Sequence, residues 1–211
     1  RLYNGMKAQK SWVKFGISPP GIWRPGNPPG IKGRDVYAAI YADSRKWLEN
    51  GWCDYFAPQL YWKIEPPEQS YPALLSWWAK QNPKGRHLWI GLGTGSVGGS
   101  WPAEEIFNQI RLTRQQAGAG GHIHYHYKTL AQNPKGLTDG LARLYAEPAL
   151  VPASPWLRPA APGQPQLTVS KTGGGALLRW TKTGAEPSWQ WVLQTRANGS
   201  WNTEILPGAR T

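Results

Sequence analysis

Two carboxylates, Glu65 and Glu68, follow a long aromatic run that ends at Trp62. If that run is a strand of a parallel sheet, both side chains lie in the loop beyond its C-terminal end, where such folds place their reacting groups. A glycosidic bond is usually hydrolysed by two carboxyl groups ~5–9.5 Å apart, one of them a general acid. Glu65 and Glu68 are therefore the catalytic candidates, and the alternative is that they are solvated loop charges. Asp54 stands at the start of the same run, which favours a role in stability.

Three residues at the end of this run could hold a sugar. Alternation along a strand turns Gln59 and Tyr61 to one face, so both are expected to point into the mouth of a barrel and to bond sugar hydroxyl groups. Trp62 offers a flat face that can stack on a sugar ring. We interpret all three as substrate-binding residues in preference to core residues.

A loop rich in proline and glycine, residues 19–33, follows the first expected strand. Long loops of this kind often carry function. Ser18 stands at its start, and Trp23 and Arg24 lie within it. The guanidinium group of Arg24 is suited to the carboxylate of an anionic sugar. We predict that Ser18, Trp23 and Arg24 also bind substrate.

His122, His124 and His126 recur at every second position, so one face of a strand would carry three imidazole groups, as a zinc site could. The nearest carboxylate in the sequence, Asp139, comes only after a loop. We therefore prefer His124 as an inward-facing hydrogen-bond partner of a sugar and expect no bound metal. A metal-dependent hydrolase that uses this strand is the less favoured alternative.

The segment 93–98 matches the G-x-G-x-x-G pattern of dinucleotide-binding folds and follows an expected strand. The next helix, however, begins only at Pro102 or Ala103, and no acidic residue stands ~20 residues further on to hold a ribose. We interpret the segment as a flexible substrate loop with Trp101 as a stacking platform, and we expect no cofactor.

The elements that must position these residues alternate along the first 150 positions. Short β-rich runs are separated by amphipathic stretches with helical spacing, which favours parallel βαβ units. Four such units make half of an eight-stranded barrel, although alternation alone also fits a small doubly wound sheet. Pro58 would disturb a central strand, so we expect a bulge there. The expected strands are 12–18, 52–62, 87–92 and 122–127, and the expected helices are 35–50, 70–80, 103–117 and 138–145.

The composition changes after residue 150. Residues 151–165 are rich in proline, as in a stiff extended linker. Residues 166–211 then contain four β-rich runs, 166–170, 176–180, 189–195 and 201–206, between glycine and Asn-Gly turns. This segment reads as a small all-β domain, too short to bury the core of a full sandwich.

Charge and hydropathy narrow the functional classes. Lys and Arg number 24 against 12 Asp and Glu, a formal net charge of +12 that favours anionic partners such as cell-wall polymers. The basic residues are scattered rather than clustered, so we expect no nucleic-acid partner. No apolar run reaches the ~18 residues of a membrane span. The 14 Trp residues suit both a core and sugar stacking, and the single Cys53 rules out an internal disulfide framework.

Three segments in order, Lys14–Pro28, Tyr41–Leu48 and Gly51–Trp62, resemble the glycosyl-hydrolase-like family 10 of bacterial proteins. The resemblance covers roughly residues 1–150. It implies the C-terminal half of a (β/α)8 TIM barrel whose members act on glycans, plausibly the glycan strands of peptidoglycan in the cell envelope, periplasmic or extracellular. The segment 166–211 resembles the first strands of a fibronectin type III domain.

The resemblance also implies that the paired aspartates of the family lie upstream of residue 1, so the missing N-terminal half of the barrel is an expected partner. We accordingly expect a glycoside hydrolase-like protein whose substrate-binding residues are supplied here. The alternative is a non-catalytic carbohydrate-binding remnant.

Overall fold

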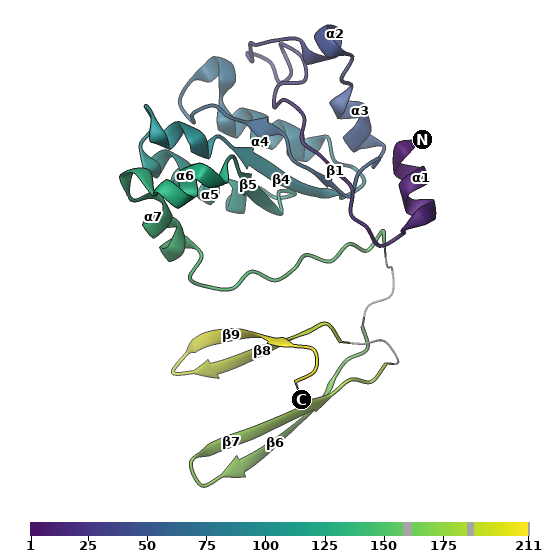
Figure 1. Ribbon diagram of the computed structural model, residues 1–211, viewed down its shortest axis with the longest axis vertical. Helices are drawn as coiled ribbons and strands as arrows, with labels where there is room; N and C mark the ends of the chain where they lie inside the picture. Colours follow the sequence, from purple (N-terminus) through teal and green to yellow (C-terminus); the bar gives the residue numbers. More distant parts are fainter. Residues whose placement is uncertain (158–161, 185–187, 211) are drawn as a thin grey trace. The chain divides into compact units, whose positions relative to one another are not determined.

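The computed structural model describes residues 1–157, 162–184 and 188–210 (Figure 1). The chain forms two compact units, Arg1–Leu144 and Tyr145–Thr211. The first unit is built around a parallel sheet, and the described part of the second contains two antiparallel hairpins. Among the described residues, every helix is too short or too polar to cross a membrane.

The sheet of the first unit is parallel throughout and contains one interrupted strand. Two short segments pair with the same neighbouring strand in one register, Tyr55 opposite His87 and Gln59 opposite Gly91, so they are two parts of a single strand. The interruption falls at Ala57–Pro58, where the sequence predicts a disturbance because proline has no N–H to donate. The strands are β1 (Gly16–Ile17), β2 (Tyr55–Phe56), β3 (Gln59–Leu60), β4 (His87–Leu92) and β5 (Gly121–His124).

The order of the strands in this sheet follows their order in the chain. β1 pairs with β2, β2 and β3 pair with β4, and β4 pairs with β5. A doubly wound sheet reverses its strand order part-way, whereas a (β/α) barrel adds each strand beside the last. The described strands show no such reversal, so the first unit is consistent with part of a barrel.

Helices separate these strands and cover one face of the sheet (Figure 1). Phe56 packs against Trp78 of a covering helix with ring centroids 5.0 Å apart, and Leu88, Ile90 and Leu92 of β4 are fully buried in the same core. The helices are α1 (Leu2–Gln9), α2 (Val36–Ile40), α3 (Ser44–Glu49), α4 (Tyr71–Lys80), α5 (Ala103–Gln115), α6 (Tyr127–Gln132) and α7 (Leu137–Leu144), with 3₁₀ turns η1 (Pro67–Gln69), η2 (Thr94–Gly98) and η3 (Pro134–Gly136).

The helix predicted over 35–50 is two helices. α2 ends at Ile40, where the C-cap residue Tyr41 has a φ of 55°, and α3 begins after Asp43, whose side chain accepts a hydrogen bond from the N–H of Lys46. Asp35 caps α2 in the same way through the N–H of Ala38. The apolar spacing across 35–50 is helical, but two N-cap aspartates start two separate helices within it.

Two predicted strands are shorter in the structure. The run 12–18 contributes only Gly16–Ile17, and Trp12 is 71% exposed. The run 122–127 ends as a strand at His124, because Tyr127 already begins α6. The strand over 87–92 and the helices over 70–80, 103–117 and 138–145 are confirmed within a few residues, whereas α1 and α6 were not predicted.

The second unit contains β6 (Gln166–Thr172) paired with β7 (Gly175–Thr181), and β8 (Gln190–Ala197) paired with β9 (Ser200–Pro207). Asn198 and Gly199, with φ of 50° and 82°, make the tight turn that the Asn-Gly pair predicts. The prediction of an all-β segment is confirmed for the described residues. The hairpins form separate two-stranded sheets, so the fibronectin-like arrangement stays a prediction.

Candidate functional site

The sheet of the first unit has one covered face and one open face. Leu88, Ile90 and Leu92 point to the helices, so the residues between them in β4 point the other way. Residues that lie opposite each other in neighbouring parallel strands point to the same face of the sheet. Gln59 and Ile123, both opposite Gly91, therefore share its face. We use the name open face for Tyr55, Gln59, Trp89, Gly91 and Ile123, together with Tyr61 and Tyr125 just beyond the ends of β3 and β5.

Gln59 and Ser18 meet at the C-terminal ends of two strands. The side-chain amide nitrogen Nε2 of Gln59 donates to the backbone oxygen of Ser18 at 3.0 Å and lies 3.4 Å from its hydroxyl oxygen. Both residues were predicted as substrate-binding, and the structure brings them together. The carbonyl oxygen of the Gln59 amide and the exposed Ser18 hydroxyl group remain available to a ligand.

A stacked pair of tyrosines lies beyond the ends of β3 and β5. The rings of Tyr61 and Tyr125 are 5.4 Å apart and inclined by 25°. Burial raises the pKa of Tyr61, and the neighbouring Tyr125 raises it further, so the Tyr61 phenol is a neutral donor at physiological pH. Tyr61 was predicted as a sugar contact. Tyr125 was missed, although it follows β5 in the same phase as Tyr61 follows β3.

Two glycines make room for this pair. A Cβ at Gly93 would lie 3.2 Å from the Cα of Tyr61, and one at Gly91 would lie 3.4 Å from its ring. The N–H of Gly95 donates to the carbonyl oxygen of Tyr125 at 2.7 Å and ties the glycine-rich loop to the end of β5. The loop therefore shapes the ends of the strands rather than a phosphate site.

Further toward the N-terminal ends of the strands, the open face carries a layer of flat rings. Trp89 stacks on Tyr55 at 4.8 Å and on His87 at 5.1 Å. A Cβ at Gly16 would collide with the ring of Tyr55, and one at Gly121 would lie 3.2 Å from Trp89. Glycine on the outer strands thus lets the rings lie flat across the sheet. On the open face, this layer of rings lies on the N-terminal side of the tyrosine pair.

The predicted orientation of His124 is wrong. His124 is the register partner of Leu92 and shares its helix-covered face, where its Nδ1 lies 2.8 Å from the hydroxyl oxygen of buried Thr94. Burial lowers the pKa of His124, and burial together with His124 and Arg114 lowers that of His122 to about 4. β5 ends at His124, so His126 lies outside the strand. The three imidazoles therefore do not all lie on one face of a strand.

The described residues hold no group of three or more His, Cys, Asp or Glu side chains that could bind a metal ion. The rings of His122 and His124 are 5.3 Å apart at 83° and pack edge to face. In this arrangement the two imidazole rings pack between the sheet and its helices.

The loop residues Trp23 and Arg24 make their contacts with a helix and with the loop's own acid. Trp23 stacks on Trp77 of α4 at 6.1 Å, which places it in the helix layer. The Nε of Arg24 is 3.1 Å from a carboxylate oxygen of Asp35, so the carboxylate that Arg24 holds belongs to the chain itself. The structure does not bring either residue to Gln59.

Two further tryptophans predicted as stacking platforms pack into or against the core. Trp101 is only 8% exposed and belongs to the core cluster, and Trp62 packs half-buried against that cluster. Both rings therefore have little free face for a sugar. The carbonyl oxygen of Trp62 accepts a hydrogen bond of 3.0 Å from buried Gln109 of α5, which fixes this loop from below.

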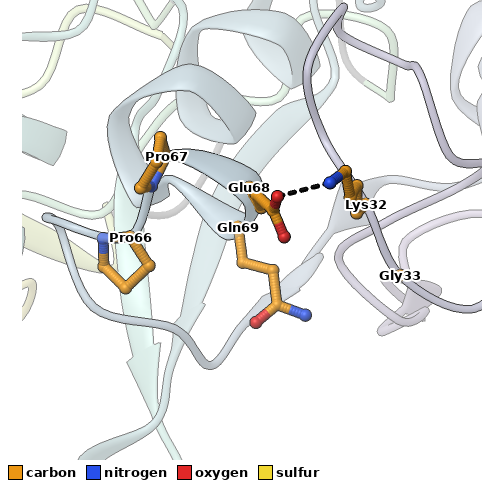
Figure 2. A pocket seen from close by; sticks show the side chains of 6 residues that line it. All are labelled: Lys32, Gly33, Pro66, Pro67, Glu68 and Gln69. Atoms are coloured by element: carbon orange, nitrogen blue, oxygen red, sulfur yellow. Dashed lines mark hydrogen bonds and ion pairs between the residues drawn. The ribbon is translucent and has the colours of Figure 1, made fainter.

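Glu65 and Glu68 lie in the loop after β3, as predicted. Glu65 is exposed, and the Glu68 carboxylate is 2.5 Å from the ammonium nitrogen of Lys32. Figure 2 shows this ion pair on the wall of a pocket of about 550 Å³ between two loops. Glu68 is the one carboxylate among the described residues that line the pocket.

Glu105, at the start of α5, was missed as a positioning residue. Its Oε1 accepts hydrogen bonds from the N–H of Ile64 and from the side-chain amide of Gln109, both at 2.9 Å. These bonds hold the β3–α4 loop against α5 directly after Tyr61 and Trp62. A glutamate in the first turn of a helix is the only sequence indication of such a clamp.

Asp54 holds the opposite end of the sheet together. Its side chain is fully buried, lies 2.6 Å from the Lys7 ammonium nitrogen and accepts hydrogen bonds from the Tyr3 hydroxyl at 2.8 Å and the Phe15 N–H at 2.7 Å. Burial and the bond to Asp54 raise the pKa of Tyr3 to about 12. The structure thus gives Asp54 a place in fastening α1 to the start of β2, in line with the stability role expected there.

Residues 1–108 match the protein family described as glycosyl hydrolase-like 10. The chain belongs to this family. It is 40% identical over 188 residues to a protein named glycosyl hydrolase YngK of Bacillus subtilis (strain 168), a match that covers 82% of this chain and 37% of that protein. It is also 40% identical over 103 residues to glycosyl hydrolase DigH of Escherichia coli (strain K12), covering 46% of this chain and 24% of that protein.

The resemblance inferred from the three sequence segments is thereby confirmed at the level of the family. The chain spans little more than a third of the length of the first relative and about a quarter of the second. Family membership and the parallel sheet are consistent with a first unit that is part of a glycosyl hydrolase-like barrel.

Proposed function

We propose that this chain supplies the substrate-binding part of a glycoside hydrolase that acts on a bacterial polysaccharide. The stacked pair of Tyr61 and Tyr125 on the open face carries the proposal. Flat aromatic rings stack on the apolar C–H faces of sugars, and amide and hydroxyl groups bond their hydroxyls. Gln59 and Ser18 provide such groups beside the rings. Parallel α/β barrels place their sites at this end of the strands.

Peptidoglycan is the polysaccharide that we propose. Its glycan strands are linked to acidic groups, and the net charge of +12 would raise the local concentration of such a polymer around the protein. A peptidoglycan substrate would place the protein in the cell envelope, periplasmic or extracellular. On this proposal the first unit is the C-terminal half of a (β/α)8 barrel and the second the beginning of a fibronectin-like domain.

Hydrolysis requires two carboxyl groups, and the Glu105 carboxylate beside Glu65 is engaged by the N–H of Ile64 and the amide of Gln109. We therefore propose that the acid and the nucleophile or base come from the remainder of the barrel, since the chain matches 37% of a glycosyl hydrolase. Within this scheme Gln59, Tyr61 and Tyr125 orient the glycan, and the glycines of the loop at 93–95 leave room for it.

Co-sedimentation of the purified chain with peptidoglycan sacculi tests the proposal. Tyr61→Ala is expected to weaken binding about tenfold, which corresponds to about 1.4 kcal/mol, because it removes one stacking face. Trp12→Ala is the matched control, since Trp12 is a ring that is 71% exposed and precedes the N-terminal end of β1, whereas the proposed site lies at the C-terminal ends of the strands. Equal affinity of wild type and Tyr61→Ala would exclude the open face as the binding site.

Release of reducing ends from the same sacculi separates the enzyme from the non-catalytic alternative. We expect the chain by itself to bind without releasing reducing ends. Release by this chain would contradict the division of roles proposed here, and Glu65→Gln and Glu68→Gln would then identify the carboxylate that reacts. A chain that binds no glycan at all would overturn the proposal altogether.

A further inference from the structure

The outer side of α2 exposes three large apolar side chains. Tyr37 is 38% exposed and Ile40 55%, and positions i and i+3 of a helix share one face; Tyr41, the C-cap residue that follows Ile40, is 88% exposed. α2 belongs to the connection that leaves the C-terminal end of β1, and Figure 1 shows it at the margin of the first unit. We use the name α2 face for Tyr37, Ile40 and Tyr41.

Tyr41 has an unfavourable backbone for its residue type. Its φ of 55° lies in the left-handed region, which glycine and asparagine adopt readily and a bulky side chain does not. Packing could offset such a cost, but 88% of this side chain is exposed. The folded unit therefore gains little from a tyrosine at this position, whereas a ligand that stacks on the ring would gain from it.

Tyr37 is held firmly beside it. Its ring packs edge to face against Trp23 at 6.0 Å, and the guanidinium carbon of Arg24 lies 4.9 Å from its centroid. The α2 face thus combines one fixed ring and one freely exposed ring. A rigid aromatic surface is well suited to binding because little side-chain entropy is lost.

The charges around the α2 face favour an anion. Exposed Arg34 and Lys46 flank the helix in sequence, and neither has an acidic partner among the described residues. Two acids stand close by in sequence: Asp35 is engaged by Arg24 and by the N–H of Ala38, and Asp43 accepts a hydrogen bond from the N–H of Lys46. Unpaired cations next to exposed tyrosines match a polymer with carboxylate groups and flat apolar ring faces.

We propose that the α2 face is a second binding surface, for an acidic polysaccharide, separate from the ends of the strands. It rests on the proposed function in that the ligand is the same class of polymer. Three side chains are far fewer than the ~20–30 residues a side of a stable protein interface, which argues against a protein partner. The surface would hold a neighbouring stretch of the polymer while the open face holds the sugar next to the reaction.

Tyr41→Gly is the decisive variant, because glycine accepts the left-handed backbone without strain. The midpoint of thermal unfolding is expected to rise by about 2 °C while the affinity for peptidoglycan sacculi and for polygalacturonate falls about fivefold. A tyrosine with a purely structural role would give lower stability together with lower affinity. Trp12→Ala, another exposed ring, is expected to leave both quantities unchanged.

Arg34→Gln tests the charge. It is expected to weaken binding to polygalacturonate severalfold and to leave any binding to neutral soluble starch unaltered. Binding of Tyr41→Gly and Arg34→Gln to polygalacturonate at wild-type affinity would overturn the inference. Tyr61→Ala, measured in parallel, distinguishes the two proposals: loss in Tyr61→Ala alone supports only the strand-end site, and loss in Tyr41→Gly alone supports only the α2 face.

Discussion

The role assigned to the histidines of β5 changes once the register of this strand on β4 is known. In the sequence they resemble metal ligands or sugar contacts, but His122 and His124 lie on the face that the helices cover. A buried imidazole is favoured in its neutral form, which explains why the pKa of His122 is lowered to about 4. Their contribution is therefore to stability, and it depends on pH.

Stability should fall as the pH drops through the interval from 6.5 to about 4. The unfolded chain binds a proton at His122 near pH 6.5, whereas the folded chain does so only near pH 4, so acid favours the unfolded state. At the lower end the loss from this residue is about 3 kcal/mol. Urea unfolding at several pH values would measure it.

His122→Gln is expected to flatten that pH dependence, because glutamine does not titrate. A smaller slope would remain, since burial also lowers the pKa of His124 and of His87, the latter with help from Lys14. An unchanged slope in His122→Gln would show that this imidazole is not buried in its neutral form.

Asp54 gives a second prediction at the same scale. Asp54→Asn should cost about 3 kcal/mol of the free energy of unfolding, because it leaves Lys7 without its buried partner at 2.6 Å. Glu104→Gln is the control, since the pair of Glu104 with Arg111 is exposed and is expected to contribute less than ~1 kcal/mol. Equal effects of the two changes on urea unfolding would contradict this role of Asp54.

At the scale of elements, the sequence was sufficient wherever periodicity and end signals agreed. α4, α5 and β4 were found within a few residues because their apolar spacing is strong and glycine or proline stands nearby. The break between α2 and α3 was missed because Tyr41 continues the helical spacing across it. A non-glycine residue in the left-handed region has no composition signal, so only the structure could reveal it.

The candidate site was predicted in part for a similar reason. Gln59 and Tyr61 follow from alternation within one strand, whereas the facing of His124 depends on where β5 pairs with β4. A shift of one residue exchanges the two faces, and sequence alone does not give the pairing. Tyr125 and Glu105 act through contacts across 64 and 41 residues of chain, which no local pattern encodes.

The packing of the aromatic rings on the sheet can be tested at Gly16. Gly16→Val should lower the free energy of unfolding by about 2 kcal/mol, because a side chain there meets the ring of Tyr55 and disturbs its stack on Trp89. Gly5→Ala in α1 is the control: it meets open space and should stabilise by up to ~1 kcal/mol. A harmless Gly16→Val in a urea titration would show that the ring layer is loosely packed.

At the scale of the whole molecule, the first unit is a sheet of parallel strands with one face covered and the other lined by aromatic rings. Such a face suits the interior of a barrel, and the rings at the ends of the strands suit the glycan contact proposed above. The second unit supplies two hairpins, whose apolar residues such as Leu167, Val169 and Trp201 are exposed among the described residues. Additional strands would cover these faces in a fibronectin-like sandwich.

Hydrogen–deuterium exchange of the chain, with and without soluble peptidoglycan fragments, tests the central claim most directly. The segments 59–62, 93–95 and 124–126 are expected to exchange more slowly when glycan is bound, because they surround the tyrosine pair at the ends of the strands. Protection confined to other segments, or none at all while fragments bind, would contradict the assignment of the glycan site to the open face.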